Sequence, residues 1–131
     1  MADYTVVNLK DDVKDMAPDF GLSPGLESRF GRKPLDAKQS GLSYYKIAPG
    51  FRTPFGHKHS EQEEHYLVIS GSARVKLDDD IVDMRTWDVV RIPRDTMRAL
   101  EGGPEGAEVL AFGAPDTDNK DVEMVQGWWS D

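Results

Sequence analysis

From Leu42 to Pro115 the chain is divided into short apolar segments of strand length, each ended by glycine, proline or aspartate. Between Ser72 and Leu77 apolar and polar residues alternate strictly, which is typical of a strand with one buried face. No helix-length segment with a regular apolar period separates these pieces. Strands joined only by turns predict an all-β fold, an antiparallel sandwich or barrel, and closing a barrel also removes exposed sheet edges.

The rest of the chain is less regular. Residues 4–9 are rich in apolar side chains and predict a first strand, and residues 10–17 predict a helical turn. Residues 19–41 are crowded with glycine, proline and charge, which indicates an irregular arm. Near the end, the adjacent Trp128 and Trp129 are too apolar to be left in water, so we expect them to pack against the barrel or a partner subunit. The predicted strands cover residues 42–47, 64–70, 72–77, 81–84, 88–92, 97–100 and 108–112, with residues 78–80 as a hairpin turn.

Length and composition exclude several classes of protein. A chain of 131 residues is the size of one domain with one modest core. Its formal net charge of −8 argues against a sequence-independent grip on nucleic acid or an anionic membrane surface. With no cysteine, it has neither disulfides nor thiolate ligands. The start has no signal-peptide pattern and no apolar run reaches membrane-spanning length, so we expect a soluble, cytoplasmic protein.

The segment His57-Lys58-His59 followed by Glu64 carries the clearest chemical signal. Side chains two residues apart in a strand point to the same side, so both imidazoles would lie on one face. A polar stretch then leads to the glutamate at the start of the next predicted strand. Two imidazoles and one carboxylate form the facial ligand set that suits iron and similar divalent metals. An accidental H-x-H on a strand is the plainer interpretation of the histidines alone.

The spacing of these residues resembles the first sequence motif of the cupins. Gly50, His57, His59, Glu64 and Gly71 follow the order of that motif, with one extra residue between Gly50 and His57. The resemblance covers roughly residues 40–115 and implies a single cupin domain with a double-stranded β-helix or jelly-roll barrel, an arm at residues 1–39 and a tail at residues 116–131. It also implies a homodimer and a small-molecule ligand at the mouth of the barrel.

The second cupin motif is only partly present. Trp87-Asp88 stands where the motif has glycine-aspartate, and Pro93 is kept. Asp95 replaces a glycine, and Arg98 replaces the histidine that is the remaining family ligand. Arginine stays protonated and has no lone pair for a metal, so the resemblance implies a reduced metal site of His57, His59 and Glu64.

Two outcomes of this substitution are open. In one, the three remaining ligands hold a divalent iron, manganese, nickel or zinc ion, and Arg98 grips an anionic substrate. In the other, Arg98 pairs with Glu64 and the pocket holds no metal, because a cation and a metal ion repel when poorly solvated. Tyr66 shares the parity of Glu64 and is expected to line the interior beside the ligand, whereas His65 should face away. Glu63 is the less favoured alternative to Glu64.

The resemblance and the site residues therefore predict a small-molecule-binding cupin, and they do not specify its activity. Its enzymatic version is a metal-dependent dioxygenase or isomerase acting on a small anionic substrate, with Arg98 orienting the acid. A metal-free ligand sensor is a second possibility, and a purely structural hydrogen-bonded interior is a third.

Overall fold

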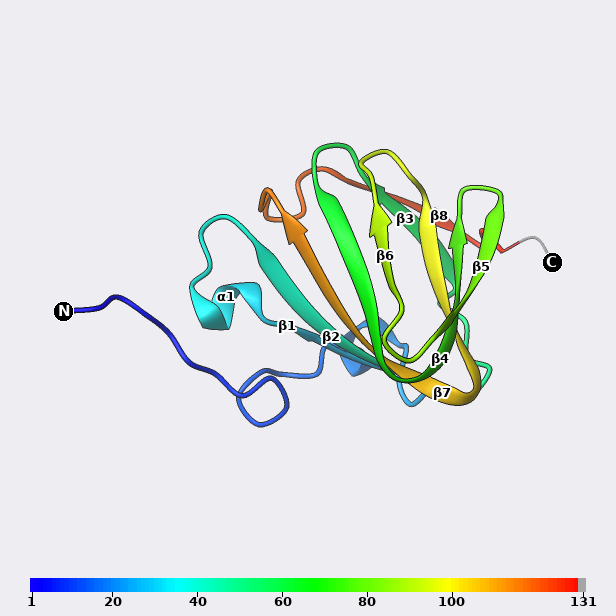
Figure 1. Cartoon of the computed structure of the whole chain (residues 1–131), viewed down its shortest axis with the longest axis horizontal. Coiled ribbons are helices and arrows are strands. Elements are labelled where there is room, and N and C mark those ends of the chain that lie inside the picture. The colour runs from blue at the N-terminus through cyan, green and yellow to red at the C-terminus, as the bar shows by residue number, and fades with distance from the viewer. Residues whose placement is uncertain (130–131) are drawn as a thin grey trace.

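The computed structural model describes residues 1–129 and shows a curled antiparallel sheet (Figure 1). Helical structure in the described chain is limited to two short elements, η1 (Pro18–Phe20) and α1 (Arg32–Leu35). No described helix is long and apolar enough to cross a membrane. The strands are β1 (Leu26–Phe30), β2 (Gly41–Ile47), β3 (Phe55–His59), β4 (Glu63–Leu77), β5 (Asp80–Arg85), β6 (Val89–Ile92), β7 (Arg98–Ala114) and β8 (Val122–Gln126).

The strands pair in the order β1-β2-β7-β3-β8, and β4 pairs with β5, β6 and β7. Every pairing is antiparallel, so the predicted all-β antiparallel fold is confirmed. The hairpin turn predicted after Leu77 is also confirmed, since β4 and β5 pair across it from Leu77 and Asp80. The two long strands bend (Figure 1), so that the first part of β4 and the last part of β7 form one layer with β6, β2 and β1. The remaining parts of β4 and β7 pair with β5 and β3, and β8 lies next to β3.

The two longest strands, β4 and β7, correct the predicted strand boundaries. The sequence predicts that a strand stops at Gly71 and that residues 97–100 and 108–112 are separate strands, and both predictions are wrong. β4 continues through Gly71, where φ is +72° and the pairing register with β7 shifts on either side. A Cβ at Gly71 would lie 2.0 Å from the carbonyl oxygen of Gly106, so the glycine permits close backbone approach. These irregularities bend the long strands without ending them.

The core lies inside the curl and is built from the alternating residues of the long strands. Val68, Val75, Val109 and Ile92 are fully buried, and Ile47 is almost so. Val68 and Val75 are seven residues apart, so strict alternation would place them on opposite faces of the strand. The register shifts between them bring both side chains inside. This apolar layer supports the polar site described below.

The N-terminal segment departs from the sequence prediction. Residues 4–9 form no strand, and Tyr4 and Val6 are largely exposed in a segment that extends away from the sheet in Figure 1. The helical turn predicted within residues 10–17 lies slightly earlier, as a single turn in which the amide of Asp12 donates to the carbonyl of Asn8. The predicted irregular arm contains β1, which pairs with β2 along its whole length. The sequence of β1 does not alternate cleanly between apolar and polar residues, so its local pattern predicts irregular chain. The strand is identified only by its pairing with β2.

The C-terminal tail packs on the sheet. Of the two expectations for the tryptophans, packing against the barrel is the one that the structure shows. β8 pairs with β3 from Val122 to Gln126. The Trp128 ring covers Gly56 so closely that a Cβ there would lie 2.6 Å from it, and Lys76 Nζ lies 3.9 Å from the same ring. Trp129 Nε1 donates to the carbonyl of Thr53. The tail therefore fixes β3, the strand that carries both site histidines.

Candidate metal centre

His57, His59 and Glu64 converge inside the curled sheet, as the sequence predicts. The two histidines lie on β3 and the glutamate near the start of β4. Each offers one ligand atom, and these atoms all lie within 4.8 Å of one another. The imidazole rings are 5.4 Å apart between centroids and nearly perpendicular, with an interplanar angle of 81°. Two residues of spacing on one strand place both rings on the same face.

Asp121 orients the His59 ring from outside the cluster. One of its carboxylate oxygens lies 3.1 Å from His59 Nδ1, which leaves Nε2 as the free ring nitrogen. The other oxygen accepts the backbone N–H groups of Glu61 and Gln62, in the loop that joins β3 to β4. Burial is the largest single influence and would raise the pKa of Asp121, but hydrogen bonds from Thr117, from His59 and from the two backbone N–H groups together hold this pKa below its usual value. A carboxylate behind a ligating histidine fixes its tautomer and ring orientation.

His57 is held in its neutral form. Burial, followed by the positive charge of Arg98 and the proximity of His59, lowers its pKa to about 3. A neutral imidazole keeps a lone pair available at neutral pH, which is the form that binds a metal ion. The site therefore provides a ligand that requires no proton release at pH 7.

Arg98 is fully buried at the first residue of β7, opposite His57 in the strand register. Its Nε lies 3.9 Å from Glu64 Oε1, close enough for charge attraction and too far for a hydrogen bond. Nε, Nη1 and Nη2 of Arg98 and Oε1 of Glu64 are all buried without a hydrogen-bond partner. A buried, unpartnered guanidinium is costly, so this arrangement indicates a site built for a further group.

Two tyrosines stand beside this charged pair. Tyr66 on β4 is 3% exposed, and its pKa is raised well above its usual value, chiefly by burial and then by the charge of Glu64. Burial and Glu64 likewise raise the pKa of Tyr45 on β2. Both hydroxyls therefore stay protonated and can donate hydrogen bonds. Tyr66 was expected here from its parity with Glu64, while sequence reasoning missed Tyr45.

The two neighbours of Glu64 on β4, which were also considered as metal ligands, have their side chains outside the cluster. Glu63 is half exposed and forms an ion pair with Arg91 at 3.4 Å, outside the cluster. His65 lies against the ring of Phe112, with ring centroids 6.0 Å apart, and is not part of the cluster either. The preference for Glu64 as ligand, and the expectation that His65 faces away, agree with this geometry. Asp121 was missed, since nothing in the local sequence around it points to a histidine 62 residues earlier.

The spacing of the three donors is close to what a metal needs. Ligands on one side of an ion, each about 2.1 Å from it at octahedral or tetrahedral angles, lie about 3.0–3.4 Å apart. The cluster satisfies a limit of 4.8 Å, so small rotations of the side chains would complete the coordination. Three donors from one side also leave the opposite face of an ion open to a ligand. The residues present therefore fit a divalent metal.

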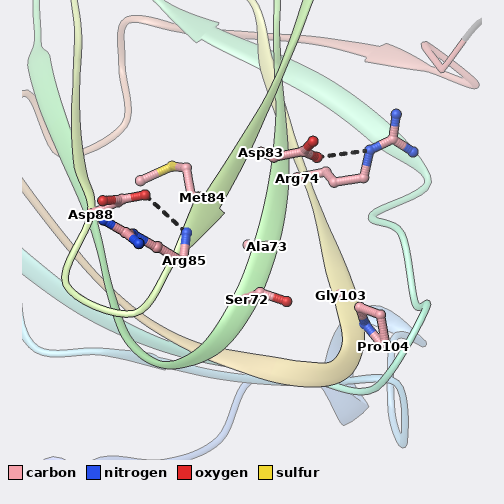
Figure 2. A pocket seen from close by; sticks show the side chains of 9 residues that line it. All are labelled: Ser72, Ala73, Arg74, Asp83, Met84, Arg85, Asp88, Gly103 and Pro104. Carbon is pink, nitrogen blue, oxygen red and sulfur yellow. Dashed lines mark hydrogen bonds and ion pairs between the residues drawn. The ribbon is translucent and has the colours of Figure 1, made fainter.

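A separate cavity of about 410 Å³ lies at the bend of the sheet, away from these residues (Figure 2). It is lined by parts of β4, β5 and β7, including Ala73, Met84 and Gly103. Among its charged residues, Arg74 Nε lies 3.5 Å from an Asp83 carboxylate oxygen, and a carboxylate oxygen of Asp88 accepts the backbone N–H of Arg85. This cavity does not contain the candidate metal ligands.

Comparison with solved structures places this fold among known proteins. The chain superimposes on KdgF from a Halomonas species with a TM-score of 0.69 and 17% identity, over 90% of this chain and 98% of that one. A cupin protein from Bacteroides fragilis gives a TM-score of 0.71 at 19% identity, over 89% and 88% of the two chains. A variant of Streptomyces Pac13 with uridine gives 0.72 at 16% identity, over 97% and 92%.

Comparison of the sequence alone gives no such match. No protein-family model matches the chain, and no curated protein sequence does so. The relationship is therefore carried by the architecture: an antiparallel sheet curled around His57, His59 and Glu64. On this basis the chain has the fold of a small cupin.

Proposed function

We propose that this protein binds a divalent metal ion through His57, His59 and Glu64 and uses that site to bind a small molecule. The supporting observation is the convergence of these three donors from two strands inside the sheet. Asp121 holds His59 in orientation, and His57 stays neutral, so two of the three ligands are prepared for metal before it arrives. Iron, manganese, nickel and zinc are the candidate ions, since each accepts imidazole and carboxylate ligands.

Arg98 and Tyr66 are the proposed ligand-binding residues. Both are buried next to Glu64, one as a permanent cation and the other as a hydroxyl donor. In an enzymatic form, this would be a dioxygenase or isomerase of a small anionic substrate. A bound metal would supply Lewis acidity or oxygen activation there. The chain itself would bind the acid, orient it and exclude water.

The solved neighbours support a small-molecule role only in general terms. One is described as a nucleoside dehydratase and was solved with uridine, and another is an oxalate decarboxylase. These activities differ from one another, and the same architecture hosts them all. The choice of ligand must therefore come from this chain's own residues.

A metal-free binding module is the second candidate. The observation that favours it is the 3.9 Å approach of Arg98 to Glu64, since opposite charges at that distance attract in a buried site. A small movement would convert the approach into a direct ion pair and occupy one metal ligand. In that form the protein would bind a polar ligand without catalysis.

Metal stoichiometry separates the two candidates. Protein prepared without a histidine tag is incubated in turn with iron, manganese, nickel and zinc, freed of excess ion and analysed for bound metal. We expect close to one ion per chain in the wild type and little in His57→Ala. The matched control is His65→Ala, which removes a histidine outside the cluster and should keep the metal. A wild type that holds no stoichiometric metal would leave the metal-free module as the better account.

Assembly as a homodimer and a cytoplasmic location stay predictions. Several large apolar side chains of the described chain are exposed, including Trp87 at 71% and Val89 at 57%. Such exposure supports a subunit contact over this part of the surface. Light scattering during size-exclusion chromatography would distinguish a dimer from a monomer of 14.7 kDa.

A further inference from the structure

We infer that Arg98 is the binding site for the carboxylate group of a small organic acid, which sits between the guanidinium and the metal ligands. This inference deepens the proposed function by naming its ligand class, and it rests on the metal site for only one of its two contacts. The starting observation is that Arg98 is fully buried while Nε, Nη1 and Nη2 have no hydrogen-bond partner.

The local charge balance calls for an anion. Arg98 carries one positive charge, and Glu64 is the acidic residue that faces it, at 3.9 Å. If Glu64 is shared with a divalent ion, the buried groups are left with an excess of positive charge. A bound anion would compensate it, because unpaired buried charge is strongly unfavourable.

The geometry favours a carboxylate over a larger anion. The unpartnered Arg98 atoms have almost no solvent-exposed surface, so neighbouring side chains must move to admit a ligand, and a small, flat group requires the smallest movement. A guanidinium edge matches the two oxygens of a carboxylate in a paired hydrogen bond. A phosphate has the same charge sign but a tetrahedral shape, which fits this buried position less well.

The distance between the two anchors suits one carboxylate. A metal bound to Glu64 through Oε1 would lie about 2.1 Å from that oxygen. Adding the 3.9 Å from Glu64 to Arg98 Nε places the ion within about 6 Å of the guanidinium. One carboxylate oxygen can then contact the ion while the other accepts from Arg98. Tyr66, whose hydroxyl interacts with Glu64, lies beside the same pair.

The test compares lactate with lactamide, two probes of similar shape of which only lactate is charged. Binding of each is measured by calorimetry to manganese-loaded and to metal-free protein. We expect lactate to bind at least tenfold more tightly than lactamide in the wild type. Arg98→Gln should abolish this preference and leave manganese binding unchanged or tighter, since a neighbouring positive charge is removed. Arg91→Gln, which removes an exposed arginine on β6, should behave as the wild type.

Each result decides the question. If manganese binds and lactate is not preferred, or if the preference survives in Arg98→Gln, the carboxylate site is wrong while the metal site stands. If manganese does not bind, the proposed metal site fails and the metal-free protein alone decides: a lactate preference that depends on Arg98 supports the inference, and no preference overturns it. Should Arg98→Gln not fold, Arg98→Lys keeps the buried charge without the paired hydrogen-bonding edge, and at least a threefold loss of the lactate preference is expected. An unchanged preference in that variant would also overturn the inference.

Discussion

The guanidinium of Arg98 and the carboxylate of Glu64 face each other 3.9 Å apart inside the sheet without a hydrogen bond between them. Arg98 occupies the position at which the resemblance to the cupins implies a histidine ligand. The chain therefore has a buried cation where the resemblance implies a ligand, and the three residues proposed to bind metal still lie together. The predictions below test the consequences of this arrangement and of the surrounding structure.

Restoring a histidine at this position should strengthen metal binding. Arg98→His removes a positive charge from beside the ion and adds a ring nitrogen that can coordinate it. We expect metal affinity to rise by roughly tenfold or more. Losing a residue that only hydrogen-bonds to a metal ligand commonly lowers metal affinity by that factor, and a direct ligand should contribute at least as much. Competition with a coloured chelator measures the change. An unchanged affinity would show that the backbone at this position no longer directs a side chain to the ion.

Removing the partner of His59 should weaken metal binding without touching a ligand. In Asp121→Asn an amide N–H₂ replaces one of the carboxylate oxygens, so either the His59 contact or the contacts to the Glu61 and Gln62 N–H groups are lost. We expect metal affinity to fall by about 10- to 100-fold. Glu123→Gln, an exposed residue of the same tail, is the matched control and should have no effect. Equal affinities for both variants would remove Asp121 from the account of the site.

The metal-free protein should lose stability on mild acidification through His57. Its pKa is about 3 in the folded protein and near 6.5 when unfolded, so between these values the unfolded chain binds a proton that the folded chain does not. The free energy of unfolding therefore falls as pH decreases from about 6.5 to 3, by at most about 1.4 kcal/mol per pH unit from this group. Urea titrations of wild type and His57→Gln at several pH values measure it. The variant should show the shallower dependence, and parallel curves would contradict the shift.

The turn before β6 should be improved by glycine. Trp87 has a φ of +76° and stands where the second cupin motif has glycine, and its side chain is 71% exposed. A bulky residue in this left-handed conformation costs about 1–2 kcal/mol, and little packing would be lost with the ring. Trp87→Gly should raise the free energy of unfolding by about 1 kcal/mol. Trp87→Ala keeps the Cβ and hence the strain, so it should change stability less. A destabilised glycine variant would mean that the indole makes contacts of its own, for example with a second subunit.

The positions of the three proposed metal ligands and of Tyr66 were predictable from local rules, whereas those of Tyr45 and Asp121 were not. The period of two along a strand places His57 and His59 on one face, and it separates Glu64 and Tyr66 from Glu63 and His65. The backbone of the second motif also survives the loss of its glycines: Trp87 and Asp95 both keep positive φ values, of 76° and 67°. Conformation there is set by the surrounding fold, and the sequence alone shows only that the favoured residue is missing.

Long-range relationships explain most of what was missed. Gly71 looks like a strand end, yet pairing with β7 continues on both sides of it after a register shift. The Asp121–His59 contact joins residues from the tail and from β3, and no local pattern encodes it. β1 is identified by its partner β2 more than by its own residues. Each of these features depends on which strands become neighbours, which periodicity within one segment does not specify.

The most direct test of the central claim is a crystal structure of the protein soaked in manganese, with anomalous scattering data collected for that metal. The account predicts one strong anomalous peak about 2.0–2.3 Å from a ring nitrogen of His57, from Nε2 of His59 and from a carboxylate oxygen of Glu64. A structure without that peak, in which Arg98 forms a hydrogen-bonded ion pair with Glu64, would contradict it.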